Sequence, residues 1–316
     1  MHSNPLVTIG IPTYRRAETY LPQAIQSAID QTYSNIEILV SDNCSDDGTE
    51  MVVQSFCDDR IQYYKQTENI GYLKNWNFCL EKANGEYFLL LLDDDLIDDD
   101  FVERCVQAVK GQSNIGLVLT GTRIIDGDGE IKAETNNQGS GHSFEDFCLG
   151  WFGSKFPLYL CSTLFLTKGL REVGGLRSKT HTYLDVAAEL KMVSKFSRVD
   201  IFDVKASFRR HDNNMGSNFM KVHEWCEDCK YLLELMCELA SGKRAEIQAV
   251  GMSYFCAQNY ERACYISSPF QRIKTLLQVN KDFHSSSSLV YFLYRSWRNA
   301  VRRRLSKMFR TVWPRS

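Results

Sequence analysis

The stretch Tyr87-Phe-Leu-Leu-Leu-Leu-Asp-Asp-Asp95 decides the fold of this chain of 316 residues. Its apolar part is too short to cross a membrane and has no polar helical face, so we predict a fully buried strand ending in carboxylates. Such carboxylates repel one another unless a cation neutralises them, and hard divalent cations prefer carboxylate oxygens. Ligands of open α/β sheets bind at the carboxyl ends of strands. We therefore predict a metal site that faces a diphosphate; a solvated acidic loop is the simpler alternative.

A second acidic group, Asp98 to Asp100, precedes an apolar helical stripe that begins at Phe101. Acidic side chains are favourable at a helix N-terminus, where the helix dipole is positive. We interpret these three residues as the start of a helix rather than as ligands.

Strand patterns alternate with helical patterns on both sides of this stretch. This alternation is typical of βαβ units and predicts an α/β fold with a mostly parallel sheet flanked by helices. We expect one α/β domain over residues 1–215, with halves at 1–120 and 121–215, and a helical region over 216–316. The predicted strands are residues 6–11, 36–40, 61–65, 87–92, 116–125, 161–166 and 199–208.

The net charge of −2 is unevenly distributed. From Tyr291 to the end, the chain carries eight Lys or Arg and no acid, which leaves −10 on the rest. Within this tail Trp297, Val301 and Leu305 repeat at helical spacing between the basic residues. Basic amphipathic helices of this kind bind anionic membrane surfaces. We predict such a membrane partner and no nucleic acid; a helix packed on the domain or a disordered tail is the alternative.

The cysteine pattern indicates a reducing compartment. The eleven cysteines form no small disulfide framework. Cys226 and Cys229 have metal-site spacing, but they lie on a predicted apolar helix face without a second pair. We expect no signal peptide and no membrane-spanning helix. The predicted location is cytoplasmic, on the inner face of the plasma membrane.

Three strand-end motifs together resemble those of family 2 glycosyltransferases with the GT-A fold. They are Pro12-Thr-Tyr14, Ser41-Asp42-Asn43 and the run Asp93 to Asp95. The resemblance covers about residues 7–212 in order. It implies inverting transfer of a sugar from a nucleoside diphosphate sugar with a divalent metal, Mg²⁺ or Mn²⁺. It also implies that residues 1–120 form the half that binds the nucleotide sugar and that residues 121–215 form the half that binds the acceptor.

The resemblance assigns a donor-binding role to the early motifs. Pro12 and Tyr14 would flank the base, on which a flat aromatic ring can stack, and Asp42 would bind the base or the ribose. A turn tyrosine and a helix-start aspartate are the alternatives.

A second donor element would be Asn69-x-Gly71 with Lys74. Gly71 would allow the backbone to approach the donor closely, and Lys74 would meet a phosphate. Helix capping by Asn69 is the alternative for this segment.

The acidic run matches the paired acids of the family. Asp94 would face the ribose or the metal and Asp95 would ligate the metal, with Asp93 as the alternate because the triple Asp leaves the register open. His211, in Phe208-Arg-Arg-His211, resembles a late histidine that joins the metal or diphosphate. A structural histidine is as plausible. Arg209 would meet phosphate or flank a strand on the surface.

On the acceptor side, the resemblance makes Asp185 the general base that takes the proton of the attacking hydroxyl. Glu189 is the runner-up, and an N-cap role for Asp185 is the alternative. Gly174 and Gly175 resemble the loop beneath the acceptor, although glycines also end helices.

The resemblance thus implies a hexosyl- or deoxyhexosyltransferase acting on a polyprenyl-diphosphate-linked saccharide in cell-surface polysaccharide or O-antigen synthesis. A nucleotidyltransferase for sugar phosphates is the first alternative, but the chain lacks a glycine-rich loop after its first strand. A non-catalytic nucleotide- or carbohydrate-binding module is the second.

Overall fold

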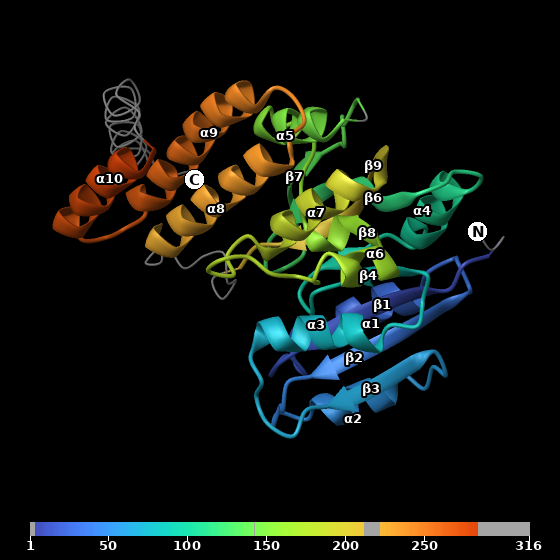
Figure 1. Ribbon diagram of the computed structural model, residues 1–316. Helices are drawn as coiled ribbons and strands as arrows, with labels where there is room; N and C mark the ends of the chain where they lie inside the picture. Colours follow the sequence, from blue (N-terminus) through green and yellow to red (C-terminus); the bar gives the residue numbers. More distant parts are fainter. Residues whose placement is uncertain (1–3, 142, 212–221, 284–316) are drawn as a thin grey trace, which may run out of the picture.

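The computed structural model describes residues 4–141, 143–211 and 222–283. In this part of the chain a sheet of nine strands carries helices on its two faces (Figure 1). The strands are β1 (Val7–Thr13), β2 (Ile36–Asp42), β3 (Ile61–Lys65), β4 (Tyr87–Leu90), β5 (Leu96–Ile97), β6 (Ile115–Ile125), β7 (Ile131–Thr135), β8 (Thr163–Leu166) and β9 (Ser197–Arg209). The helices are α1 (Leu21–Ile29), α2 (Thr49–Ser55), α3 (Tyr72–Lys82), α4 (Phe101–Val109), α5 (Phe144–Phe152), α6 (Thr167–Glu172), α7 (Leu184–Lys195), α8 (Val222–Leu239), α9 (Arg244–Cys264) and α10 (Pro269–Phe283).

The strand order is β3-β2-β1-β4-β8-β6-β9-β5, and β7 pairs with β6. The first four strands in this order are parallel to one another, and β6 is parallel to β9. Antiparallel β8 joins the two parallel groups. The mostly parallel α/β fold predicted from the sequence is therefore confirmed.

Strand β4 lies inside the sheet and is buried on both faces. Phe88 and Leu90 contact the core beneath α3, whereas Tyr87 and Leu89 contact the core beneath α1. Side chains of successive strand residues point to opposite faces, which is why an unbroken apolar run suits this position. The strand ends at Leu90, two residues before the end of the predicted one, and the triple Asp follows at its carboxyl end.

The helical region packs onto the α/β part through a shared core (Figure 1). Cys229 and Leu232 of α8 lie in the same apolar cluster as Phe147 of α5 and Leu190 of α7. As predicted, the cysteine pair lies on the buried face of a helix, and all eleven cysteines are free thiols. A boundary at residue 215 stays a prediction, because the core continues across it.

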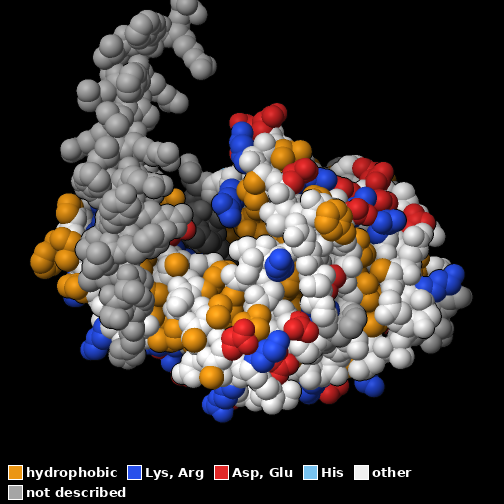
Figure 2. Space-filling view, turned by 90° about the horizontal axis from the view of Figure 1, so that it is seen from above, with side chains coloured by type: hydrophobic (Ala, Val, Ile, Leu, Met, Phe, Trp, Pro, Cys, Tyr) orange, Lys and Arg blue, Asp and Glu red, His pale blue; other side chains and the backbone are white. Residues whose placement is uncertain are grey.

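Helix α10 exposes apolar side chains at the edge of the molecule. Phe270 is 82% exposed, and Ile273 and Leu277 are also exposed. In Figure 2 hydrophobic side chains gather at the left edge, where α10 lies. None of the helices in the described ranges is both long and apolar enough to cross a membrane. The predicted basic helix after Tyr291 lies outside the described residues.

The acids after the triple Asp do precede a helix, but two of them serve mainly in ion pairs. Asp98 binds Arg123 of β6 at 2.5 Å. Asp100 occupies the N-cap position of α4 without capping it, and binds Lys205 of β9 at 2.7 Å. These contacts fix the loop after β4 against the far half of the sheet.

Candidate active site

Asp93 lies beside the end of β1. Its Oδ2 accepts a hydrogen bond of 2.7 Å from Thr13 Oγ1. Burial raises the pKa of Asp93 to about 7, and the negative charge of Asp94 adds to the rise. A cation close to this carboxyl group would stabilise its ionised form and so lower its pKa.

Asp94 lies beside His211, the histidine predicted to join the same site. His211 Nε2 lies 2.9 Å from Asp94 Oδ2, although 117 residues separate the two in the chain. The imidazole also packs against the ring of Tyr20, with the centroids 4.9 Å apart. The structure thus brings His211 to the acidic run, while its role as a ligand stays a prediction.

Asp95 points into the protein and is 1% exposed. Its Oδ1 accepts a hydrogen bond of 2.9 Å from the backbone N–H of Arg209. Burial and the charge of Asp94 raise the pKa of Asp95 well above its usual value. One oxygen of Asp95 is thus occupied by β9, and Asp95 is less exposed than Asp94, which is 8% exposed.

Arg209 is a central residue whose position the sequence did not reveal. It is the largest fully buried side chain among the described residues, which contradicts the surface alternative. Its guanidinium donates to the carbonyl of Asp94 at 2.8 Å and to Gln23 Oε1 at 2.7 Å. The group also lies over the ring of Tyr20, 4.6 Å from the centroid. Arg209 therefore fixes the acidic loop to α1 and β9 and offsets part of its negative charge.

The predicted base-binding residues lie at the ends of β1 and β2. Pro12 pairs with Ser41 in the sheet. Tyr14 is 38% exposed, and the guanidinium of Arg15 lies 5.1 Å from its ring centroid. This exposed ring is accessible to a flat ligand.

Asp42, by contrast, is completely buried. Tyr63 Oη donates to Asp42 Oδ2 at 2.7 Å, and the backbone N–H of Ser45 donates to Oδ1 at 2.9 Å. Both carboxylate oxygens therefore have protein partners, which shape the turn after β2.

Asn69 closes a turn before α3 rather than capping the helix. Its Oδ1 accepts from the backbone N–H of Gly71 at 3.0 Å and from Asn43 Nδ2 at 2.9 Å. Gly71 is the N-cap and has φ of 81°, with open space where a Cβ would lie. Lys74 is exposed on the first turn of α3. Asn43, whose own Oδ1 accepts from Ile70 N–H at 2.8 Å, joins the two donor-side loops.

Gly174 and Gly175 do end helix α6, as the helix-capping alternative predicted. Their backbone N–H groups donate to Arg171 O at 3.1 Å and Leu170 O at 2.9 Å. Asn77 of α3 then holds the next residue, because its Oδ1 accepts from Leu176 N–H at 3.0 Å. The loop at Gly174 and Gly175 is thereby attached to α3, the helix that follows the turn at Asn69. Its contact with an acceptor stays a prediction.

Asp185 lies in the first turn of α7, half-buried. Tyr183 is the N-cap, so the N-cap interpretation of Asp185 is wrong. Its Oδ1 accepts from the backbone N–H of Val186 at 2.8 Å. Burial raises the pKa of Asp185 to about 6, and the charge of Asp228 adds to the rise.

Glu189, the runner-up, is completely buried between α7 and β8. Its Oε1 accepts from Thr163 Oγ1 at 2.9 Å, and its Oε2 has no hydrogen-bond partner. Burial and the charge of Asp185 raise its pKa well above the usual value. Of the pair, Asp185 is half-buried and Glu189 is completely buried, and a catalytic role for either stays a prediction.

Within the described residues no group of three or more His, Cys, Asp or Glu side chains is arranged to hold a metal ion by itself. Asp93, Asp94 and His211 nonetheless supply the carboxylate and imidazole donors that Mn²⁺ and Mg²⁺ accept. A diphosphate can complete such a partial set, because Mg²⁺ sites commonly combine one or two carboxylates with substrate phosphates.

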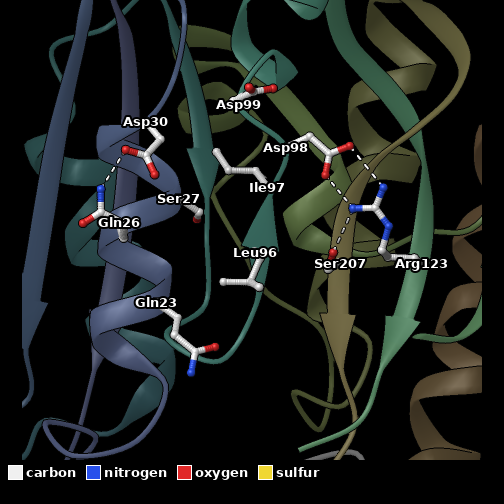
Figure 3. Close-up of a pocket in the computed structure, with 10 residues that line it drawn as sticks. All are labelled: Gln23, Gln26, Ser27, Asp30, Leu96, Ile97, Asp98, Asp99, Arg123 and Ser207. Carbon is white, nitrogen blue, oxygen red and sulfur yellow. Dashed lines mark hydrogen bonds and ion pairs between the residues drawn. The ribbon is translucent and has the colours of Figure 1, made fainter. Parts of the chain in front are cut away.

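A surface cavity of about 430 Å³ lies between α1, β5 and β9 (Figure 3). Its wall includes the ion pair of Arg123 with Asp98 and the side chain of Gln23. None of the predicted site residues lines it. One of its lining residues, Gln23, accepts a hydrogen bond from Arg209 of the candidate site.

The sequence is similar to known glycosyltransferases. Residues 8–168 match the family described as Glycosyl transferase family 2. The GalNAc(5)-diNAcBac-PP-undecaprenol beta-1,3-glucosyltransferase of Campylobacter jejuni is 32% identical over 176 residues, which are 53% of this chain and 55% of that protein. The putative teichuronic acid biosynthesis glycosyltransferase TuaG of Bacillus subtilis is 26% identical over 222 residues, 69% of this chain and 84% of that protein. An uncharacterized glycosyltransferase of Rickettsia typhi is 37% identical over 124 residues. The chain spans 38% of the Rickettsia protein and about half of the Campylobacter one.

Solved structures share the fold. S. aureus TarS 1–349 in complex with UDP-GlcNAc superposes with a TM-score of 0.63 at 14% identity, covering 88% of this chain and 80% of that one. The mannosyltransferase PcManGT of Pyrobaculum calidifontis, in complex with GDP-Man and Mn²⁺, gives a TM-score of 0.52 at 17% identity, covering 99% and 88%. With the family match over half of its length, this chain belongs to glycosyl transferase family 2 and has the GT-A fold.

Proposed function

We propose that this chain transfers a sugar from a nucleoside diphosphate sugar to a hydroxyl of a saccharide acceptor, with inversion at the anomeric carbon. The observation that carries the proposal is the convergence of Asp93, Asp94 and His211 at the carboxyl ends of β4 and β9. Ligands of open α/β sheets bind at such an edge. The mannosyltransferase that shares the fold is in complex with GDP-Man and Mn²⁺, which supports a nucleoside diphosphate sugar as donor and a divalent metal.

Asp94 and His211 would hold a divalent metal, Mg²⁺ or Mn²⁺, with Asp93 as a further donor. When bound, the metal neutralises the charge that develops on the departing diphosphate. Asp95 would act indirectly here, by fixing the loop to β9 through Arg209. This proposal differs from the assignment made from the sequence, in which Asp95 ligates the metal and Asp94 faces the ribose or the metal.

The donor base would stack on Tyr14, beside Pro12. Buried Asp42 would shape the turn that meets the base or ribose, with its two oxygens held by Tyr63 and Ser45. Asn69 and Gly71 would bring backbone close to the donor, and exposed Lys74 would meet a phosphate.

Asp185 would act as the general base. It accepts the proton of the acceptor hydroxyl while that oxygen bonds to the anomeric carbon and the diphosphate departs with its electron pair. Its pKa of about 6 keeps it ionised at neutral pH and basic enough to accept a proton. The Gly174–Gly175 loop would lie under the acceptor.

We further propose a polyprenyl-diphosphate-linked acceptor, at the cytoplasmic face of the plasma membrane, in cell-surface polysaccharide synthesis. The undecaprenol in the name of the Campylobacter relative supports this acceptor class. The basic tail after Tyr291 supports the location, because an anionic surface attracts basic segments.

The test is a transfer assay with UDP-, GDP-, CDP- and dTDP-sugars, Mn²⁺ and polyprenyl-diphosphate saccharides, read by mass spectrometry of the lipid product. We expect one donor to be used, with inverted configuration in the product. A folded chain that transfers sugar from none of these donors contradicts the proposal.

Asp185→Asn should reduce turnover by about 10²–10⁴-fold, the range of general-base catalysis, and leave donor binding intact. Wild-type kcat/KM should fall as the pH drops below about 6, because the base is then protonated. Exposed Glu172→Gln, at the end of α6, is the matched control and should keep full turnover. Near-normal turnover of Asp185→Asn would remove Asp185 from the reaction.

A further inference from the structure

Asp228 gathers an unusual number of hydrogen bonds from one segment of chain. It lies on α8, in the helical region, and is completely buried. Among the described residues, its two carboxylate oxygens accept hydrogen bonds from residues 178–183, the segment that leads into α7. The donors are Ser178 Oγ at 2.6 Å, Thr180 N–H at 2.7 Å, Thr182 N–H at 2.7 Å, Thr182 Oγ1 at 2.8 Å and Tyr183 N–H at 2.9 Å.

This segment is neither helix nor strand, so nothing in its own backbone pattern fixes it. Two further hydrogen bonds connect the segment to the helices α8 and α3. Thr180 Oγ1 donates to Glu224 O of α8 at 2.8 Å, and Tyr72 Oη of α3 donates to His181 O at 3.2 Å. Asp185 follows the last of these residues by two positions. The segment directly before the proposed base is therefore bound by a carboxylate some 40 residues later in the chain.

The charge of Asp228 also acts on Asp185. Burial alone would raise the pKa of Asp228, but the hydrogen bonds from Ser178, Thr180, Tyr183 and Thr182 outweigh burial and hold it below the usual value. Asp228 is therefore an anion at neutral pH, and its charge contributes to the raised pKa of Asp185. Asp185 in turn acts on Glu189, one turn later on α7, whose pKa its charge helps to raise.

We infer that Asp228 is a positioning residue for sugar transfer: it holds residues 178–183, and so presents Asp185 to the acceptor. The inference rests on the proposed function of Asp185. It assigns the helical region a part in the reaction, although that region supplies no residue to the proposed donor site.

The test is Asp228→Asn, measured in the full chain. Asparagine keeps the shape but turns one acceptor oxygen into a donor and removes the charge. We expect kcat to fall at least about tenfold, as for other supporting residues, with the donor Kd unchanged. The acidic limb of kcat/KM against pH should also move to lower pH, which a purely structural defect would not cause.

Glu227→Gln is the matched control. Glu227 is the adjacent acid on α8 and binds Lys179 of the same segment at 2.7 Å at the surface. It should keep both kcat and the pH profile. A folded Asp228→Asn with normal kcat and an unmoved acidic limb overturns the inference.

If Asp228→Asn does not fold, Ser178→Ala and Thr182→Val each remove one hydroxyl donor and decide the question. A lower kcat at unchanged donor Kd supports the inference, and unchanged kcat in both overturns it. Failure of the wild-type chain to transfer sugar would refute the proposed function, whereas an active wild type with unaffected variants refutes this inference alone.

Discussion

Glu189 is a carboxyl group that lowers stability when it ionises. It is buried, one oxygen has no partner, and its pKa lies well above 4.5. The folded state therefore binds a proton that the unfolded state has lost, so stability falls as pH rises from the unfolded pKa through the folded one, by at most about 1.4 kcal/mol per pH unit.

Glu189→Gln cannot ionise at this position. We therefore expect the free energy of unfolding of the variant, relative to that of the wild type, to be higher at pH 8 than at pH 5. Urea denaturation at the two pH values measures this difference. Glu172→Gln, which alters an exposed carboxylate paired with Lys195, should follow the wild type. A variant whose stability changes with pH in parallel with the wild type would show that Glu189 is not protonated in the fold.

Single residues were predictable where a local motif carried them. The triple Asp, His211 and Asp185 were singled out from their positions at strand and helix ends, and the structure brings His211 to Asp94. The buried position of Arg209 and the contacts of Asp228 were not predicted, because both depend on partners that lie far away in the sequence. Strand alternation held a clue for Arg209, which follows half-buried Phe208.

At the scale of elements, the loop after α6 is constrained by α3. Gly174 and Gly175 have φ of 94° and 70°, so alanine is strained at both positions. A Cβ on Gly175 would lie 2.4 Å from Asn77 Oδ1, whereas one on Gly174 would meet nothing within 4 Å. Alanine substitutions at the two positions therefore distinguish the energetic cost of backbone strain from that of steric contact.

We expect Gly174→Ala to lower the free energy of unfolding by roughly 1 kcal/mol. Gly175→Ala should lose at least about 1 kcal/mol more, because the new methyl group displaces the Asn77 amide that holds Leu176. Chemical denaturation of both variants measures the difference. Equal losses would mean that the contact with α3 contributes nothing to the loop.

The elements themselves were predicted well because their patterns are local. Buried β4 and the strands β1, β2 and β3 form where the sequence predicted strands, within about two residues at each end. The position of β8 between β4 and β6, antiparallel to both, was not predictable. Such pairing is decided by packing between distant segments, which periodicity does not report.

At the scale of the whole molecule, the basic tail is the proposed membrane contact. Removing residues 295–316 takes away all eight of its basic residues and leaves the described helices in place. We expect the shortened chain to lose association with vesicles containing anionic lipid, since each basic residue contributes about 1 kcal/mol near such a surface.

Flotation with anionic vesicles at low and high salt measures this loss, and neutral phosphatidylcholine vesicles are the control. Binding of the full chain should weaken with salt, because salt screens surface charges. Unchanged association after the deletion would place the contact elsewhere. The exposed apolar residues Phe270, Ile273 and Leu277 of α10 would then be the next to test.

The central claim is a metal-dependent site for a nucleoside diphosphate at the carboxyl ends of β4 and β9. The measurement that tests it most directly is calorimetric titration with UDP, GDP, CDP and dTDP, with and without Mn²⁺, in the wild type and Asp94→Asn. The account predicts that one nucleotide binds, at least about tenfold more tightly with Mn²⁺, and that Asp94→Asn removes this metal dependence. A folded wild-type chain that binds none of the four, or binds one equally well without metal, would contradict it.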